Sequence, residues 1–358
     1  MRPPLWARGG HAQTLLAYMS PAPGEALEPR SLPKGLVPES KLDSLGSGVA
    51  RREVPVSDGD RVVVMDAAPM GQGPLDGVTV HLMHGLTGCT ESNYMRFSAA
   101  VLRRRGARVF GFNHRGQGPG EGLAKRLYHS GSFADLWASV AAGRGLYPDS
   151  IHLAVGFSLS ANTALLGITE RGSGLPEGAY PDGVVAVNPP VDLRACAIRI
   201  ETGFNRLYDR NFVRGLRAAV EQRKANGWLP ESVTIPPGAS VRGADEAVTA
   251  PLAGYASADD YYADCSSGPR LGSLTRPAVI LSSRDDPFIA PEDIEEAAAG
   301  TPVVVHMEAT GGHLGYLQRP TASKLLDLKL VEELPGIERR WLAGALLHYV
   351  QALKAEVG

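Results

Sequence analysis

The chain has 358 residues, of which 44% are hydrophobic and 21% charged, so it can bury a large core and is not expected to be disordered. Its formal net charge of −2 gives no electrostatic reason to expect nucleic acid or an anionic membrane as a partner. The three cysteines, Cys89, Cys196 and Cys265, lack the spacing of a zinc site or a disulfide framework, which favours a reducing compartment.

The N-terminal region does not resemble a targeting segment. Residues 1–16 contain arginines but no apolar stretch followed by a small-residue cleavage site, and no apolar run approaches the roughly 18 residues of a transmembrane helix. Residues 20–50 are rich in Pro, Gly and Ser. We therefore expect a cytoplasmic protein with no transmembrane segment, in which residues 1–50 form an irregular leader packed on the core.

Short apolar, β-branched runs follow the leader, each ended by turn residues. Runs of this kind indicate strands buried on both faces, and their alternation with helices predicts an α/β fold with a mostly parallel central sheet and helices on both faces. The predicted strands are 61–67, 77–85, 107–116, 150–158, 183–190, 277–286 and 301–309.

Amphipathic stretches between and after these runs predict helices over 94–106, 161–172 and 337–356. The alternation is interrupted once, over residues 191–276, where 212–226 reads as helix and no clear strand occurs. Structureless loops of that length are uncommon, so this segment is predicted to be a helical lid inserted into a core domain of residues 51–190 and 277–358.

The segment GFSLS, residues 156–160, follows a predicted strand and opens a predicted helix. In a nucleophile elbow, a serine lies on a strained strand-to-helix turn between small residues, and its hydroxyl is exposed. Gly156 and Ser160 are small, so Ser158 is the candidate nucleophile. The alternative is an ordinary strand–helix junction in which Ser158 is the N-cap residue.

The segment HGLTG, residues 84–88, directly follows another predicted strand. In the α/β-hydrolase arrangement, a loop at this place contributes one backbone amide to the oxyanion hole, and the residue after the nucleophile contributes the second. Leu86 and Leu159 are the candidates for these two amides. The alternative is a glycine-rich turn with a core-facing His84.

Two further loops follow the last two predicted strands and complete the order Ser, Asp, His. His313 follows two glycines and is the candidate base. Asp286 and Asp285 compete as the acid that orients it, and we favour Asp286 because it begins the segment DPFIAP. A metal cluster of Asp285, Asp286 and His313 is the other interpretation, but the chain has no HxH or HxxxH pair, so no metal or other cofactor is predicted. His81, His152 and His306 lie inside strand runs and are expected to pack in the core or against helices.

Several segments together resemble the YheT-like branch of the α/β-hydrolases, which includes plant embryogenesis-associated and yeast ethyl-ester-forming members. They are HAQTL, HGLTGCTESNYMRF, FNHRGQGPGEG, YHSGSFADL, GFSLSAN, NPPVDL and DDPF, and the resemblance runs from about residue 10 to 350. Family members usually have GFSLG, so Ser160 is the clearest departure.

The resemblance implies hydrolysis of small-molecule carboxylic esters with short- to medium-chain acyl groups. The family's catalytic serine, aspartate and histidine correspond to Ser158, Asp286 and His313, and no diffusible cofactor is implied. Two alternatives remain open at this point. One is an acyltransferase that passes the acyl group to an alcohol, and the other is a catalytically silent protein that uses the fold to bind an apolar ligand.

Overall fold

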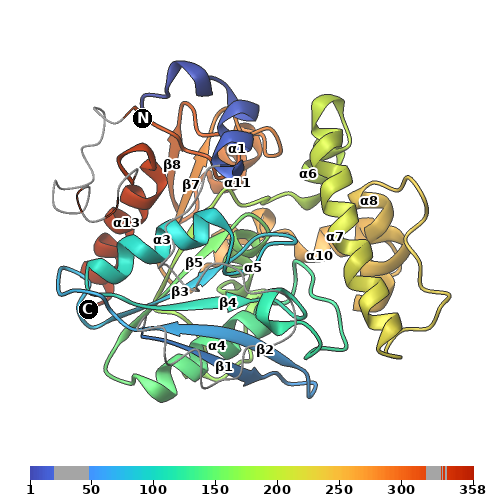
Figure 1. Cartoon of the computed structure of the whole chain (residues 1–358), viewed down its shortest axis with the longest axis horizontal. Helices are drawn as coiled ribbons and strands as arrows, with labels where there is room; N and C mark the ends of the chain where they lie inside the picture. Colours follow the sequence, from blue (N-terminus) through green and yellow to red (C-terminus); the bar gives the residue numbers. More distant parts are fainter. Residues whose placement is uncertain (20–47, 320–331, 333, 335–336) are drawn as a thin grey trace.

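A central β-sheet organises the computed structural model, which describes residues 1–19, 48–319, 332, 334 and 337–358 (Figure 1). The sheet has eight strands in the order β1-β2-β4-β3-β5-β6-β7-β8. The strands are β1 (Val49–Pro55), β2 (Arg61–Ala67), β3 (Val78–Met83), β4 (Arg108–Asn113), β5 (Ile151–Phe157), β6 (Gly183–Val187), β7 (Ala278–Ser283) and β8 (Val304–Glu308).

The six strands from β4 to β8 pair in parallel, and β1 and β2 add an antiparallel edge, because β1–β2 and β2–β4 are antiparallel. The register places Val80 beside Val109 on one side and Leu153 on the other. The predicted α/β fold with a mostly parallel sheet is therefore confirmed.

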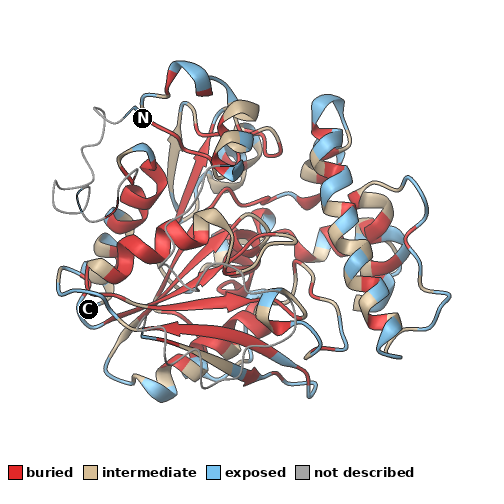
Figure 2. Ribbon diagram, in the orientation of Figure 1, coloured by how far each residue is buried: buried red, intermediate tan, exposed pale blue. Residues whose placement is uncertain are grey.

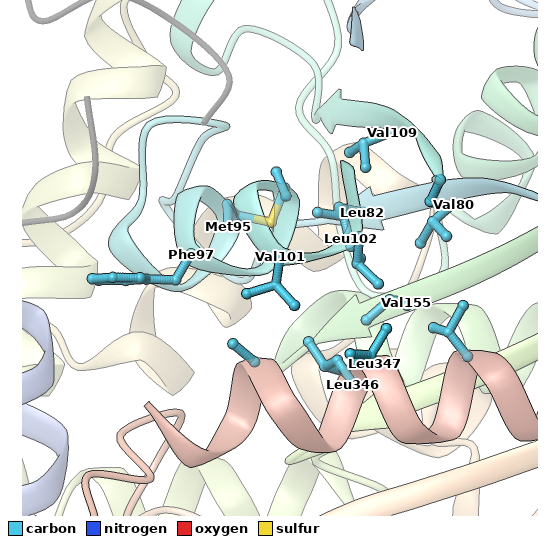
Figure 3. Close-up of a cluster of buried hydrophobic side chains, with 14 of the residues drawn as sticks. Val80, Leu82, Met95, Phe97, Val101, Leu102, Val109, Val155, Leu346 and Leu347 are labelled. Atoms are coloured by element: carbon cyan, nitrogen blue, oxygen red, sulfur yellow. The ribbon is translucent and has the colours of Figure 1, made fainter. Parts of the chain in front are cut away.

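Helices connect the strands and cover both faces of the sheet. The helices of the core are α3 (Asn93–Arg104), α4 (Phe133–Leu146), α5 (Leu159–Gly167), α11 (Pro291–Ala298) and α13 (Trp341–Val357), and short 3-10 turns lie at Gly118–Gly120, Glu170–Gly172, Glu177–Ala179 and Ile337–Arg339. Apolar residues of α3 and α13 pack on one face and those of α4, α5 and α11 on the other. Figure 3 shows the first of these layers, where Val101 and Leu102 of α3 and Leu346 of α13 meet Val80 and Leu82 of β3.

The segment between β6 and β7 is helical and contains no strand, and all of its residues are described. It comprises α6 (Leu193–Ile200), α7 (Arg206–Ala225), α8 (Val241–Ala244), a π-helical turn (Asp245–Thr249), α9 (Ala250–Ala253), α10 (Ala258–Cys265) and 3-10 turns at Gly203–Asn205 and Gly268–Ser273. The helices α6, α7, α8 and α10 stand together at one side of the molecule in Figure 1. The role of this insertion as a lid stays a prediction.

The N-terminal segment differs in part from the irregular leader expected for residues 1–50. Leu5–Ala7 form a 3-10 turn, and Gly10–Met19 form the helix α1, whose first residue lies against the loops that follow β7 and β8. At its other end, Val49 and Ala50 already belong to β1. The expectation of irregular structure is therefore wrong for α1 and for the start of β1, and residues 20–47 lie outside the described residues.

Candidate active site

Ser158 lies on the turn between β5 and α5, with a backbone φ of 54° and ψ of −119°. A non-glycine residue with positive φ is uncommon, and such strain concentrates at functional sites. The turn is tight, because a Cβ on Gly156 would lie 2.5 Å from the carbonyl oxygen of Ser160. Ser158 occupies the N-cap position of α5, but its side chain makes no capping hydrogen bond. The hydroxyl is therefore available for another partner.

That partner is the imidazole of His313. Ser158 Oγ lies 2.8 Å from His313 Nε2, and His313 Nδ1 lies 2.9 Å from Asp286 Oδ2. The side chain of Asp286 is fully buried, and its other oxygen accepts hydrogen bonds from the amides of Phe288 at 2.8 Å and Ile289 at 3.3 Å. The structure thus brings together the three candidate residues from three separate loops at the carboxyl ends of β5, β7 and β8.

The two neighbouring aspartates have different partners. Asp286 points to His313, whereas Asp285 Oδ1 accepts hydrogen bonds from the backbone amides of Gly311 at 2.7 Å and Gly312 at 2.8 Å. Those amides directly precede His313 in the chain. The geometry therefore favours Asp286 as the acid and gives Asp285 the task of anchoring the loop that carries the histidine.

Asn188 supports the acid from the end of β6 and was not singled out by the sequence reasoning. Its Nδ2 donates to Asp286 Oδ2 at 2.6 Å, and its Oδ1 accepts from the hydroxyl of Tyr316 at 2.9 Å. Asn188 has a φ of 48°, which asparagine tolerates better than most residues. An asparagine directly after a buried strand, in NPP, is the signal that could have identified it.

Helix α1 contacts the loop that carries His313. The hydroxyl of Thr14 accepts a hydrogen bond from the backbone amide of His313 at 2.8 Å. Gln13 donates to the carbonyls of Ala7 and Leu317 and accepts from the amide of Leu317. These two residues belong to the HAQTL segment, so the structure gives that motif a physical role in placing His313.

Most backbone amides of the loop after β3 have hydrogen-bond partners among the described residues. The amide of Gly85 donates to Tyr94 Oη, that of Thr87 to Tyr128 Oη and that of Gly88 to the carbonyl of Gly85. The amide of Leu86 makes no hydrogen bond with a described residue.

The loop also lies directly against the elbow, since a Cβ on Gly85 would come 3.0 Å from Ser158 Cβ. At the elbow itself, the amide of Ser158 donates to the carbonyl of Val187, and that of Leu159 has no partner among the described residues. Two unoccupied donors beside a serine hydroxyl are what an oxyanion hole requires.

Ser160, the departure from the family pattern, is fully buried and connects the elbow to the loop after β3. Its hydroxyl donates to the carbonyl of His84 at 2.5 Å and lies 2.7 Å from His114 Nε2. His84 Nε2 accepts from the amide of His114, so the proton of the neutral ring lies on Nδ1, which donates to the carbonyl of Gly85. Burial lowers the pKa of His84 to about 4 and that of His114 well below its usual value, so both rings are neutral.

The helical insertion lies close to the histidine. The ring of Phe288 is 4.6 Å from that of His313, and Tyr208 of α7 contacts Phe288 at 4.8 Å. A Cβ on Gly215 of α7 would lie 2.6 Å from Thr87 Cγ2, so α7 also touches the loop after β3. The insertion therefore borders the site on two sides.

The described residues contain no group of three or more His, Cys, Asp or Glu side chains that could hold a metal ion. None of their helices has the length and apolar character to cross a membrane.

Comparisons with known proteins agree with the fold. Residues 78–320 match the family described as the alpha/beta hydrolase fold. A protein of Escherichia coli (strain K12) named "Putative esterase YheT" is 30% identical over 240 residues, which cover 66% of this chain and 69% of that protein. The esterase Pf2001 of Pyrococcus furiosus superposes with a TM-score of 0.51 at 18% identity, covering 87% of this chain and 99% of that one.

Two eukaryotic relatives are longer than the matched region. A mouse protein named phospholipase ABHD3 is 30% identical over 67% of this chain and 58% of its own length. A yeast protein named medium-chain fatty acid ethyl ester synthase/esterase 2 is 26% identical over 68% of this chain and 59% of its own. The chain thus spans less than two thirds of either relative.

Proposed function

Because the chain belongs to the alpha/beta hydrolase fold family and, within it, to the YheT-like branch, we propose that it is a serine hydrolase of carboxylic esters. The observation that carries the proposal is the line of hydrogen bonds from Ser158 through His313 to Asp286. Relatives named esterase and phospholipase support ester hydrolysis in general. Short- to medium-chain acyl esters are the proposed substrates.

The proposed reaction proceeds in two acyl-transfer steps. His313 takes the proton of Ser158 Oγ, which attacks the ester carbonyl carbon, and the Leu86 and Leu159 amides stabilise the negative charge on the carbonyl oxygen. The carbon–oxygen ester bond then breaks, and the alcohol leaves with the proton from His313. Water, deprotonated by His313, attacks the acyl-enzyme and releases the acid, while Asp286 keeps the imidazole oriented and stabilises its charged form.

Replacement of the nucleophile tests the proposal. Ser158→Ala is expected to lower kcat on p-nitrophenyl acyl esters by several orders of magnitude, because it removes the hydroxyl that forms the acyl-enzyme. The variant should keep the circular dichroism of the parent protein and lose labelling by a fluorophosphonate, which reacts only with an activated serine. Ser173→Ala, at an exposed serine, is the matched control and should keep both activity and labelling.

Fluorophosphonate labelling also separates an enzyme from a catalytically silent binding protein, because a silent protein would not be labelled even with Ser158 intact. Full turnover by Ser158→Ala would contradict the assignment of the nucleophile. A panel of p-nitrophenyl esters of graded length tests the proposed acyl chains, for which kcat/KM should be highest at short to medium length.

Acyl transfer to an alcohol is a second candidate function, favoured by the yeast relative whose name includes ethyl ester synthase. The same acyl-enzyme would be attacked by an alcohol instead of water, with His313 as the base in both cases. Product analysis in the presence of ethanol distinguishes the two activities. Ethyl ester as the main product would establish the transferase, and free acid as the main product would establish the hydrolase.

A further inference from the structure

The first part of the insertion carries a concentration of positive charge that the net charge of the chain conceals. Residues 193–220 contain six arginines and two carboxylates, whereas the whole chain has a formal net charge of −2. Five of these arginines are exposed, and only the first has an ion pair with a described residue, Asp259 at 3.5 Å. These five form the arginine face of α6 and α7: Arg194, Arg199, Arg206, Arg210 and Arg214.

The two carboxylates of this segment form no ion pair with the arginine face among the described residues, and each accepts a hydrogen bond from another residue. Asp209 is buried and accepts a hydrogen bond from the amide of Val241 at 2.7 Å. Glu201 accepts from the hydroxyl of Ser240. The helical spacing of Arg206, Arg210 and Arg214 places them along one side of α7, so the charged residues on the exposed side of its first turns are all positive.

Large apolar side chains stand among these arginines. Ile198 is 49% exposed, Phe204 50% and Leu207 53%. In Figure 2, the exposed residues of α6 and α7 form pale blue stretches at the side of the molecule away from the sheet. Exposed apolar residues within a cationic surface are the combination found on proteins that lie on anionic lipid surfaces.

The arginine face adjoins the candidate active site. Phe204 contacts the ring of His11 of α1 at 4.7 Å, and Asn205 Nδ2 donates to the carbonyl of Pro287, next to Asp286, at 2.7 Å. A surface that held these helices would therefore lie beside the loops that carry the candidate catalytic residues.

We propose that the arginine face, with Ile198, Phe204 and Leu207, docks the protein on a lipid surface that carries anionic headgroups. The arginines attract the phosphate groups, and the three apolar side chains enter the region between headgroups and acyl chains. Nucleic acid would use the arginines but leave the apolar residues in water, so the lipid surface accounts for more of the observations. Hydrolysis of lipid-held esters by the docked protein rests on the proposed function, whereas the docking does not depend on it.

Vesicle sedimentation tests the docking without any catalytic step. The Ser158→Ala protein is expected to sediment with vesicles of phosphatidylglycerol and phosphatidylcholine and to remain largely in solution with phosphatidylcholine alone. Added salt should release it, since exposed charges are screened. Absence of sedimentation with the anionic vesicles would overturn the proposal, and so would equal sedimentation with both kinds of vesicle.

Matched variants locate the contact. Arg206→Gln with Arg210→Gln should weaken binding to the anionic vesicles roughly twenty-five-fold, at about five-fold per basic residue. Arg61→Gln with Lys125→Gln removes the same charge from exposed positions elsewhere and should change binding little. Leu207→Ser should also weaken binding, and Leu252→Ser, at a residue 43% exposed on α9, should not. If Leu207→Ser bound as tightly as the parent while the arginine variant did not, the face would be a site for a soluble polyanion, and the lipid proposal would be wrong.

Activity is measured in protein that retains Ser158. The Arg206→Gln, Arg210→Gln variant should hydrolyse a soluble short-chain p-nitrophenyl ester at the parental rate and a vesicle-held ester more slowly. Equal loss on both substrates would overturn the proposal. Inactivity of the parent protein on both would contradict the proposed function and leave the vesicle-binding result to decide the docking.

Discussion

At the scale of single residues, the site depends on two adjacent aspartates with separate partners. Asp286 contacts the imidazole of His313, and Asp285 binds the two glycine amides before it. The sequence placed both carboxylates at the end of the same strand, and Asp286 was favoured only because it begins the segment DPFIAP. A difference of one residue in a loop does not fix where a side chain points. The hydrogen bonds of the folded loop make that distinction.

Asparagine replacements should separate the two roles. Asp286→Asn is expected to lower kcat on a soluble ester by roughly 10⁴-fold, because an amide stabilises the wrong tautomer of the histidine and cannot stabilise its cation. Asp285→Asn keeps an oxygen that can accept from both glycine amides, so most of kcat should remain. Steady-state kinetics of the pair is the measurement. Equal losses in the two variants would contradict this division of roles.

Ser160 shows how a departure from a family pattern can be compensated locally. Its hydroxyl joins the carbonyl of His84 to His114 in a fully buried network. Ser160→Ala is therefore expected to destabilise the fold by about 1–3 kcal/mol, because a buried carbonyl and a buried ring N–H lose their partner. Since His84 begins the loop that holds Leu86, kcat should fall several-fold with little change in KM. Urea denaturation and steady-state kinetics check both parts, and unchanged kcat would show that the network serves stability alone.

At the scale of elements, α1 was the least predictable part of the site. The leader was expected to be irregular because of its Pro, Gly and Ser content, but that composition belongs to residues 20–50 and not to the helical segment before them. The β1 strand was missed for a related reason. Its residues VARREVP include four charged or proline positions, and an edge strand lacks the continuous apolar run that marks a central one.

The remaining strands and the helices α3 and α13 were located within a few residues, because buried parallel strands and amphipathic helices have strong hydrophobic patterns. Helix α7 begins at Arg206, six residues before the predicted start, and α4 was not predicted. The order of the predicted strands also placed the three candidate catalytic loops at one edge of the sheet. It could not reveal Asn188, Thr14 or Ser160 as supporting residues, since each acts through a hydrogen bond to a residue distant in the chain.

The contact of α1 with the histidine loop predicts a strong effect at Gly10. A Cβ at this position would lie 1.6 Å from the carbonyl oxygen of Asp285, so Gly10→Ala should displace α1 and lower both kcat and the rate of fluorophosphonate labelling. Alanine favours helix over glycine, so the loss cannot come from helix propensity. Thr14→Ser retains the hydroxyl that binds the His313 amide and serves as the control. Parental labelling of the Gly10→Ala protein would show that α1 does not position the loop.

At the scale of the whole molecule, several buried histidines make stability depend on pH. Burial lowers the pKa of His84 and His129 to about 4, and that of His81 and His114 well below the usual value. In the unfolded chain these rings bind protons near pH 6.5. The unfolded state therefore binds more protons as the pH falls below that value, and the free energy of unfolding decreases.

The decrease should be on the order of 2 kcal/mol for each of these histidines between pH 7.5 and pH 5. Asp245 opposes it in part, because burial raises its pKa to about 6, so that between pH 6 and 4 it binds a proton preferentially in the folded state. Urea midpoints at the two pH values provide the measurement. A midpoint that does not fall at pH 5 would mean that the histidines are not neutral in the folded protein.

The hydrogen bond between Thr14 and the amide of His313 joins positions 299 residues apart. During synthesis, α1 leaves the ribosome 299 residues before the loop that it holds. At about 5–20 residues per second, Ser158 therefore spends many seconds in the cell without its base or the support of that base. A nascent chain should accordingly be unreactive toward esters, and the capacity for hydrolysis should arise in a single late step, when the two distant segments first meet.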